Sequence, residues 1–312
     1  MQALLDVILP VFVVIGFGYI ARRFKVFDDT AVDGVMRYAQ NFAAPVLLFT
    51  SILKLDLGAA FQPKLLLAFY SAAFVSFFTA FFAAHLAFRR PLTDSVAIGF
   101  VALFSNSLLL GVPITERAYG AEALAGNFAI IAMHSPLFYG FGIALMEWAR
   151  ARGQGMGRGR LVAHIARTIL TQPLVFGITC GFLVRLTGLP LPGALLSGVQ
   201  MVAVTAIPAA LFGLGGVLVR YRPDGDFRLI ALLCGCSLVL HPGLTYVTGR
   251  FVLDLPVPAL RSAVMTAAMA PGVNAFVFAN FYGVGKRVAA STVLIATGLS
   301  IGTIWVWLHI LP

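Results

Sequence analysis

The most informative stretch of the sequence is residues 106–120, which read Asn106-Ser-Leu-Leu-Leu-Gly111-Val-Pro113-Ile-Thr-Glu-Arg-Ala-Tyr119-Gly120. An amide, a glycine and a proline stand here inside an apolar run long enough to cross a bilayer. Because proline removes a backbone donor and clashes with the preceding turn, the helix should kink or break. In hydrocarbon, a broken helix is tolerated only where protein or a water-filled cavity covers the freed backbone groups. Such breaks near mid-membrane are typical of transporter binding sites.

The composition indicates a polytopic membrane protein. Of the 312 residues, 60% are hydrophobic and 11% are charged, whereas a soluble domain carries about 25% charged residues. Apolar runs of roughly 20 residues, the length that spans a bilayer, follow one another along the chain. We predict an all-α fold of ten transmembrane helices, at about residues 3–22, 32–54, 64–88, 93–119, 126–149, 163–186, 194–219, 227–250, 257–283 and 288–310.

The net charge of +10 is explained by membrane topology better than by nucleic-acid binding, which we do not expect. The loops that follow odd-numbered spans all lie on one side of the predicted membrane. Sixteen of the 22 Lys and Arg residues lie on that side, and six lie on the other side. By the positive-inside rule, both termini are expected outside the cytoplasm. Arg22 and Arg23 follow the first apolar run, so this run is predicted to be a mature span and not a signal peptide.

The chain divides into two halves of five predicted spans each. They cover residues 1–149 and 163–312, and a basic, glycine-rich cytoplasmic linker, residues 150–162, joins them. A shift of 163 residues places one half on the other and aligns Pro10 with Pro173, Gly18 with Gly181, Arg22 with Arg185, Pro45 with Pro208, Phe49 with Phe212, and Tyr119-Gly120 with Tyr282-Gly283. Because five is odd, such halves have opposite orientations. We therefore predict a 5+5 inverted repeat, the design of secondary transporters, with broken crossover helices at spans four and nine.

The ninth span carries the partner of the first break, because it too holds Pro, Gly and Asn within an apolar run. Half-helix N-termini that meet near the midplane offer unpaired N–H groups and partial positive charge, which favour an anion such as a small carboxylate. The residues assigned to this substrate site are Asn106, Ser107, Gly111, Pro113, Pro271, Gly272 and Asn274. The alternative is that both breaks are plain kinks, since Pro and Gly are common in membrane helices.

Five further residues are weaker candidates. Pro45 and Pro208, at matched positions, and Gln172, at the start of the sixth span, either line the site or belong to plain kinks. His134 and His241 lie inside apolar spans beside prolines. They are either structural residues satisfied by a freed carbonyl or members of a proton relay.

The sequence does not indicate an enzyme. It contains no HExxH, GxSxG or P-loop motif, and its spans are almost free of carboxylates. We expect no cofactor and no metal site. Cys180, Cys234 and Cys236 all lie within predicted spans, where free cysteine is typically inert apolar filler.

These motifs resemble those of the auxin efflux carrier family, which includes plant auxin exporters and bacterial malonate permease-like carriers. Asn106, followed by Gly-Val-Pro113 and Ala-Tyr-Gly120, is similar to the first crossover motif of that family, and residues 271–282 are similar to the second. The resemblance covers the whole chain. It implies a scaffold domain, a mobile crossover domain, elevator-type transport and a bacterial inner-membrane location. The third span has no acidic residue where the plant carriers place one, so auxin itself is not carried over.

The expected function is secondary transport of a small organic carboxylate, such as malonate or another metabolic acid. One alternative is a sodium-coupled organic anion symporter of the bile-acid type, and another is a channel-like anion pathway. The lipid bilayer and the carboxylate are the expected partners. Small residues at helical spacing fit either internal packing or a homodimer.

Overall fold

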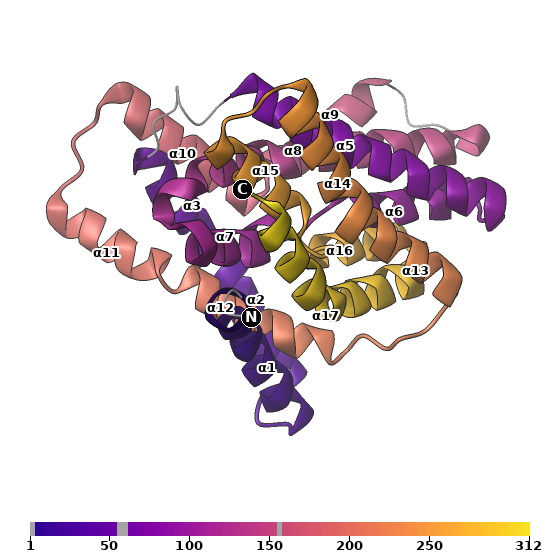
Figure 1. Cartoon of the computed structure of the whole chain (residues 1–312), viewed down its shortest axis with the longest axis horizontal. Coiled ribbons are helices and arrows are strands. Elements are labelled where there is room, and N and C mark those ends of the chain that lie inside the picture. Colours follow the sequence, from indigo (N-terminus) through magenta and orange to yellow (C-terminus); the bar gives the residue numbers. More distant parts are fainter. Residues whose placement is uncertain (1–3, 55–61, 155–157) are drawn as a thin grey trace.

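The computed structural model describes residues 4–54, 62–154 and 158–312, and the regular elements in this part of the chain are helices (Figure 1). Residues 4–154 form η1 (Leu4–Ile8), α1 (Leu9–Arg23), α2 (Asp29–Tyr38), η2 (Ala39–Ala43), α3 (Ala44–Lys54), α5 (Pro63–Phe82), η3 (Ala83–Ala87), α6 (Leu92–Leu103), η4 (Ser107–Gly111), α7 (Val112–Tyr119), η5 (Ala121–Ala123) and α8 (Leu124–Gln154).

Residues 158–312 form α9 (Arg158–Leu170), α10 (Pro173–Thr187), α11 (Gly193–Ala203), α12 (Ala206–Leu218), α13 (Phe227–Gly235), η6 (Cys236–Leu240), α14 (His241–Val247), η7 (Thr248–Val252), α15 (Val257–Ala267), α16 (Val273–Tyr282) and α17 (Lys286–Ile310). Helix α8 continues to Gln154, so helix occupies much of the stretch predicted as a linker. Residues 155–157 of that stretch lie outside the described residues.

The all-helical fold predicted from the sequence is confirmed. Within the described residues, six helical stretches are long and apolar enough to cross a membrane, namely Leu5–Arg23, Pro63–Ala87, Leu124–Arg150, Gly193–Leu218, Phe227–Val252 and Lys286–Ile310. Shorter apolar helices, α6, α10 and α16, lie next to the breaks of the predicted fourth, sixth and ninth spans. Many large apolar side chains face outward, such as Phe17, Phe176 and Phe281, and an exterior of this kind suits lipid.

Three prolines sit just after a widened helical turn. Pro45, Pro113 and Pro242 are each the second residue of a helix (α3, α7 and α14) that follows a five-residue π-helical turn (η2, η4 and η6). Proline has no N–H to donate and clashes with the carbonyl four residues earlier, and the wider turn relieves both conflicts. The fourth span is therefore helical at Pro113, and its break lies at residues 104–106, about two turns earlier.

One group of helices, the paired bundle, consists of α1, α2, α3, α10, α11 and α12. Helix α1 packs along α12, and α10 packs along α3. A Cβ on Gly18 would lie 1.8 Å from the Phe212 carbonyl oxygen, so α1 and α12 touch through backbone. A Cβ on Gly181 would lie 2.9 Å from Ile52 Cβ and 3.1 Å from the Phe49 carbonyl oxygen. Both contacts therefore depend on the missing side chain of glycine.

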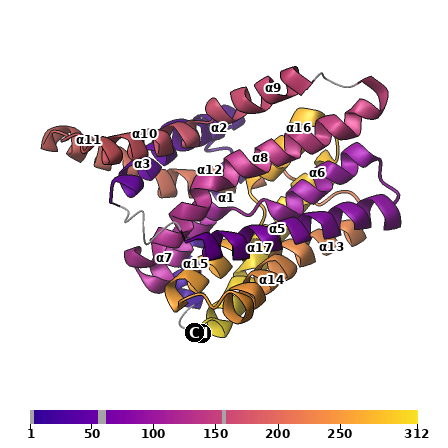
Figure 2. The same ribbon diagram turned by 90° about the horizontal axis from the view of Figure 1, so that it is seen from above.

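Helices α5 to α8 and α13 to α17 form the crossing bundle, which contains both broken crossover spans. Figure 2 shows α3, α10 and α11 along one side of the molecule and α5, α13 and α14 along the opposite side. Large, fully buried phenylalanines fill the crossing bundle, among them Phe69, Phe77, Phe100, Phe138 and Phe278. Phe100 and Phe278 stack with ring centroids 3.9 Å apart and join α6 to α16.

An ion-pair network joins the C-terminal end of α1, the N-terminal part of α2 and the segment just after α12. Arg22 donates two hydrogen bonds to the Asp29 carboxylate, at 3.0 and 2.7 Å. Arg220 reaches Asp29 at 2.8 Å and Asp33 at 2.7 Å. The hydrogen bond from Arg22, together with the charges of both arginines, holds the pKa of Asp29 below its ordinary value.

Both ends of the described chain are tied to the region of α7 and α15. Arg117 of α7 donates hydrogen bonds of 2.9 and 2.6 Å to the Asp6 carbonyl oxygen. Arg261 stacks over the Tyr119 ring at 4.5 Å and donates to the Pro312 carbonyl oxygen at 2.6 Å. The two ends of the described chain therefore lie close to each other's contacts with α7 and α15.

Candidate functional site

The two broken spans cross at residues 104–106 and 270–272. Ser105 and Pro271 face each other in an antiparallel bridge. The Asn106 N–H donates to the Ala270 carbonyl oxygen at 2.8 Å, and the Gly272 N–H donates to the Phe104 carbonyl oxygen at 3.1 Å. Each break therefore supplies hydrogen-bond partners for the other, as non-helical backbone at membrane depth requires.

A cavity of about 110 Å³ lies between this crossing and the paired bundle. An enclosed water needs about 10–15 Å³, so the cavity has room for a small ligand. Its described lining is largely amide, hydroxyl and apolar, and consists of Gln40, Asn41, Ala44, Phe104, Ser105, Asn106, Ser107, Leu108, Leu109, Ile131, His134, Ser135, Gln172, Pro173, Leu174, Gly272, Val273 and Asn274.

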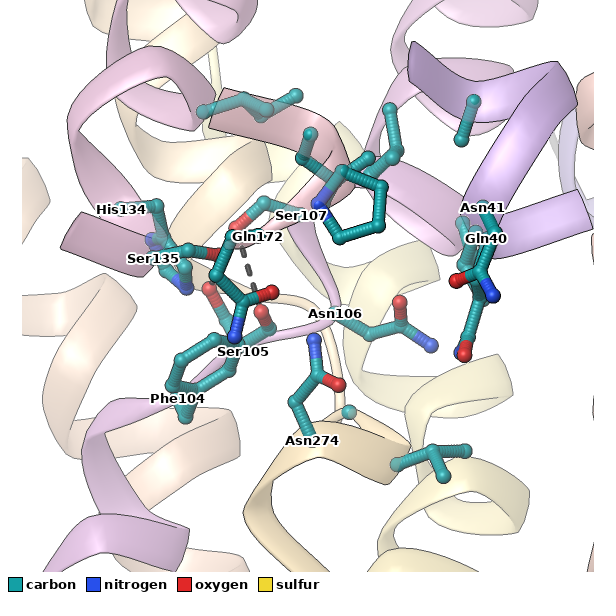
Figure 3. Close-up of a pocket in the computed structure, with 18 residues that line it drawn as sticks. Gln40, Asn41, Phe104, Ser105, Asn106, Ser107, His134, Ser135, Gln172 and Asn274 are labelled. Atoms are coloured by element: carbon teal, nitrogen blue, oxygen red, sulfur yellow. Dashed lines mark hydrogen bonds between the residues drawn. The ribbon is translucent and has the colours of Figure 1, made fainter. Parts of the chain in front are cut away.

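Figure 3 shows how the polar side chains are arranged. The amides of Asn106 and Asn274 lie near the centre, Gln40 and Asn41 lie on one side, and His134 lies on the other. The lining thus combines side chains from both crossover spans with others from α8 and the paired bundle. Ser105 and Ser107 also share a hydrogen bond of 3.0 Å beside Asn106.

Three helices begin at the cavity. The residues immediately before them are Asn106 for η4 and α7, Gly272 for α16, and Gln172 for α10. At these three helix starts no side chain of the preceding residue caps the helix N–H groups. Each start carries roughly half a positive charge. The Ser107 N–H of η4 already donates to the Ser105 carbonyl oxygen at 2.8 Å, and Pro173 of α10 has no N–H, so the N–H groups of the residues that follow are the available donors there. Because no Lys, Arg, Asp or Glu is among the described lining residues, the helix ends favour an anion in a formally neutral cavity.

The structure brings together six of the residues singled out in the sequence. Asn106, Ser107, Gly272 and Asn274 line the cavity from the crossover spans, and Gln172 lines it from the start of α10. His134 is the sixth. Gln172 supplies a third helix start that the inverted-repeat argument alone does not predict.

Six other singled-out residues, one of them His241, are not among the described residues that line this cavity. Pro271 lies in the bridge between the breaks, and Gly111 is buried at the end of η4. Pro45 lies at the contact of α3 with α10. Pro113 and Pro208 line a separate groove, which lies between α7 and α12.

The two membrane histidines occupy different surroundings. His134 lines the cavity, whereas His241 is buried at the start of α14 and is not among the described lining residues. The Phe69 ring lies against both, with centroid distances of 5.8 Å to His134 and 4.9 Å to His241. Among the described residues, no three His, Cys, Asp or Glu side chains gather as a metal site.

Sequence reasoning missed four polar lining residues, Gln40, Asn41, Ser105 and Ser135. Gln40 and Asn41 lie in η2, four to five residues before Pro45. The combination of amides and a following proline is the signal that singled out Asn106, so it could have identified these two as well. Ser105 and Ser135 are each adjacent to a residue that was singled out.

A helical fold with an apolar exterior, whose two broken spans cross at a small polar cavity, is typical of membrane transporters. A family model described as membrane transport protein matches residues 3–308. The chain belongs to this family, that of the auxin efflux carriers, and is a multi-pass membrane transporter and not an enzyme. The resemblance seen in the sequence is thereby confirmed.

Three relatives illustrate the range of the family. The chain is 24% identical over 305 residues to a Rhizobium meliloti (strain 1021) protein named "Putative malonate transporter", with 97% of this chain and 94% of the relative covered. It is 21% identical over 306 residues to "Uncharacterized transporter YfdV" of Escherichia coli (strain K12), with 97% and 96% covered. It is 21% identical over 350 residues to "Auxin efflux carrier component 8" of Arabidopsis thaliana, with 95% and 94% covered.

Proposed function

We propose that the chain is a secondary transporter that carries a small organic carboxylate, malonate or a similar metabolic acid, by elevator-type alternating access. The observation that carries the proposal is the convergence of three uncapped helix starts on one small cavity. Five amide side chains add N–H donors there without adding a formal charge, and helix starts with amides suit a carboxylate. The printed name of the Rhizobium relative supports malonate as the first substrate to test.

The proposed architecture is a 5+5 inverted repeat with ten membrane crossings. Residues that the shift of 163 aligns make reciprocal contacts, because Gly18 meets Phe212 and Gly181 meets Phe49. A two-fold relation between the halves predicts this exchange, since a contact from the first half to the second is matched by one from the second to the first. Gly120 and Gly283, also aligned, both have positive φ, 82° and 76°, after α7 and α16.

In the proposed cycle the paired bundle stays fixed and the crossing bundle moves past it with the substrate. The surface between the bundles near the cavity is apolar, and its buried residues are Leu48, Ile52, Val112, Leu124, Phe128, Ile131 and Ile178. The described ion pairs lie within one bundle or its adjoining loops and do not join α3 or α10 to α7 or α8. An apolar contact without ion pairs permits one bundle to slide along the other, because the hydrophobic effect does not depend on the relative direction of the groups in contact. Both termini are proposed to lie outside the cytoplasm, in a bacterial inner membrane.

Proteoliposomes that contain the purified full chain test the function. Uptake of radiolabelled malonate is measured alongside competition by other mono- and dicarboxylates, with and without pH and sodium gradients. A carrier gives saturable uptake and counterflow, in which unlabelled substrate inside drives transient accumulation of label. Uptake that does not saturate and shows no counterflow indicates a channel, and absence of uptake for every acid overturns the proposal.

A further inference from the structure

The cavity at the crossing has one ionisable side chain among its described lining residues, that of His134. Its residue is 4% exposed, and neither ring nitrogen has a hydrogen-bond partner in the described structure. Buried polar atoms in proteins nearly always have a partner, so this imidazole is available to pair with a water or a ligand in the cavity.

The surroundings of His134 are aromatic. The Phe104 and Phe138 rings each lie 4.6 Å from the imidazole, centroid to centroid, and the Phe69 ring lies 5.8 Å away. The main-chain carbonyl of Ser105 interacts with the ring but does not reach hydrogen-bond geometry. The imidazole thus has apolar walls, one backbone acceptor nearby and the polar cavity in front of it.

The titratable groups of the neighbouring helices do not supply a countercharge. From α14, His241 reaches His134 electrostatically. From α5, the Tyr70 hydroxyl donates to the Ile130 carbonyl oxygen at 2.7 Å. Tyr139 of α8 packs on Phe104 at 5.7 Å. Among the described residues no carboxylate or cationic side chain interacts with His134. A ligand is therefore the group best able to pair with an imidazolium here.

We propose that His134 takes up one proton from water when a carboxylate enters the cavity, and that the proton crosses the membrane with the substrate. This inference rests on the proposed function. A carboxylate buried among neutral groups is costly, and so is a lone imidazolium, whereas the pair of them is stabilised by charge and hydrogen bonding. One imidazolium N–H would donate to the carboxylate and the other to the Ser105 carbonyl oxygen. On release, the proton returns to water on the far side.

The proposal specifies what the cavity carries. A monocarboxylate would move as a neutral pair with His134, and a dicarboxylate would move with one net negative charge. The sequence suggests, as one alternative, a proton relay of His134 and His241. Here His134 alone takes up the proton, because His241 is not part of the described lining.

Calorimetric titration of malonate into the purified full chain tests the proton uptake. Binding heats are compared in buffers of different ionisation enthalpy, at several pH values between about 6 and 9, around the range where histidine titrates. We expect uptake of up to one proton per malonate over the pH range in which the imidazole is neutral in the free chain and charged in the complex, and an apparent Kd that rises about tenfold per pH unit over that range. His134→Gln should bind malonate with no linked proton and no such slope.

Two controls isolate His134. His309→Gln makes the same change at an exposed histidine on α17 and should keep the proton linkage. His241→Gln should also keep it, and loss of the linkage in that variant would overturn the single-site proposal. Malonate binding without proton uptake by the wild-type chain also overturns it while leaving the carboxylate site intact, even if His134→Gln does not fold. If malonate, oxalate, succinate and pyruvate all fail to bind, the proposed function itself fails.

Discussion

Replacing Gly18 with alanine should separate α1 from α12. The new Cβ would lie 1.8 Å from the Phe212 carbonyl oxygen and 2.7 Å from its carbonyl carbon. Ordinary van der Waals contact begins near 3.4 Å, so the two backbones must part by about 1.6 Å. Main-chain atoms cannot rotate away as a side chain can. Overpacking of this kind lowers the free energy of unfolding by roughly 1–3 kcal/mol, and a backbone clash belongs at the upper end.

Gly16 offers a matched control on the same helix, because a Cβ there would meet no heavy atom within 4 Å. Gly16→Ala removes only the conformational cost of a helical glycine and should stabilise by up to about 1 kcal/mol. The two variants should therefore differ by about 2–4 kcal/mol. For a chain of this size, that corresponds to an apparent Tm difference on the order of 3–6 °C.

The assay is thermal unfolding of purified protein in detergent, followed with a thiol-reactive dye. Cys234 and Cys236 are buried and free, so they react when the chain unfolds. Gly181→Ala provides a second comparison and should lie between the other two variants, because its closest neighbour is the Ile52 side chain. Equal midpoints for Gly18→Ala and Gly16→Ala would refute the backbone contact between α1 and α12.

Two further predictions concern hydrogen bonds and charge. Asn127 of α8 donates to Thr115 at 3.2 Å and to Thr266 at 2.7 Å, which joins both crossover spans. Asn127→Ala should lower the free energy of unfolding by about 1–2 kcal/mol. In the double variant with Thr266→Val, the total loss should be smaller than the sum of the two single losses. Strictly additive losses would contradict the hydrogen bond between Asn127 and Thr266. The depressed pKa of Asp29 implies stability that is present above its ordinary value of about 3.9 and lost as pH falls through the folded value. The wild-type Tm should therefore fall more than that of Asp29→Asn on acidification below about pH 4, and equal falls would contradict this role.

Much of the crossing could be predicted from the sequence. Asn106 and Asn274 stand out because an amide inside an apolar span needs a reason, and both line the cavity. The position of the break was harder to predict. Pro113 drew attention as a helix breaker, but a π-helical turn accommodates it and the chain leaves the helix at residues 104–106.

The contribution of the paired bundle to the cavity could not be obtained from local patterns. Gln40 and Asn41 face the crossover only because α3 and α10 pack beside it, and this depends on contacts between distant segments. Gly177 shows the same dependence: its Cβ would lie 2.3 Å from the Pro45 carbonyl oxygen, a closeness that neither local sequence indicates. The reciprocal glycine contacts agree with the proposed repeat, which was first inferred from aligned residues.

The most direct test of the carboxylate site is malonate uptake by proteoliposomes that contain Asn106→Ala. Asn280→Ala serves as the matched control, because Asn280 is an exposed asparagine on α16. With equal amounts of folded protein, we predict saturable uptake by the wild type and by Asn280→Ala, and loss of uptake by Asn106→Ala. Wild-type uptake by Asn106→Ala would contradict the assignment of the crossover cavity as the carboxylate site.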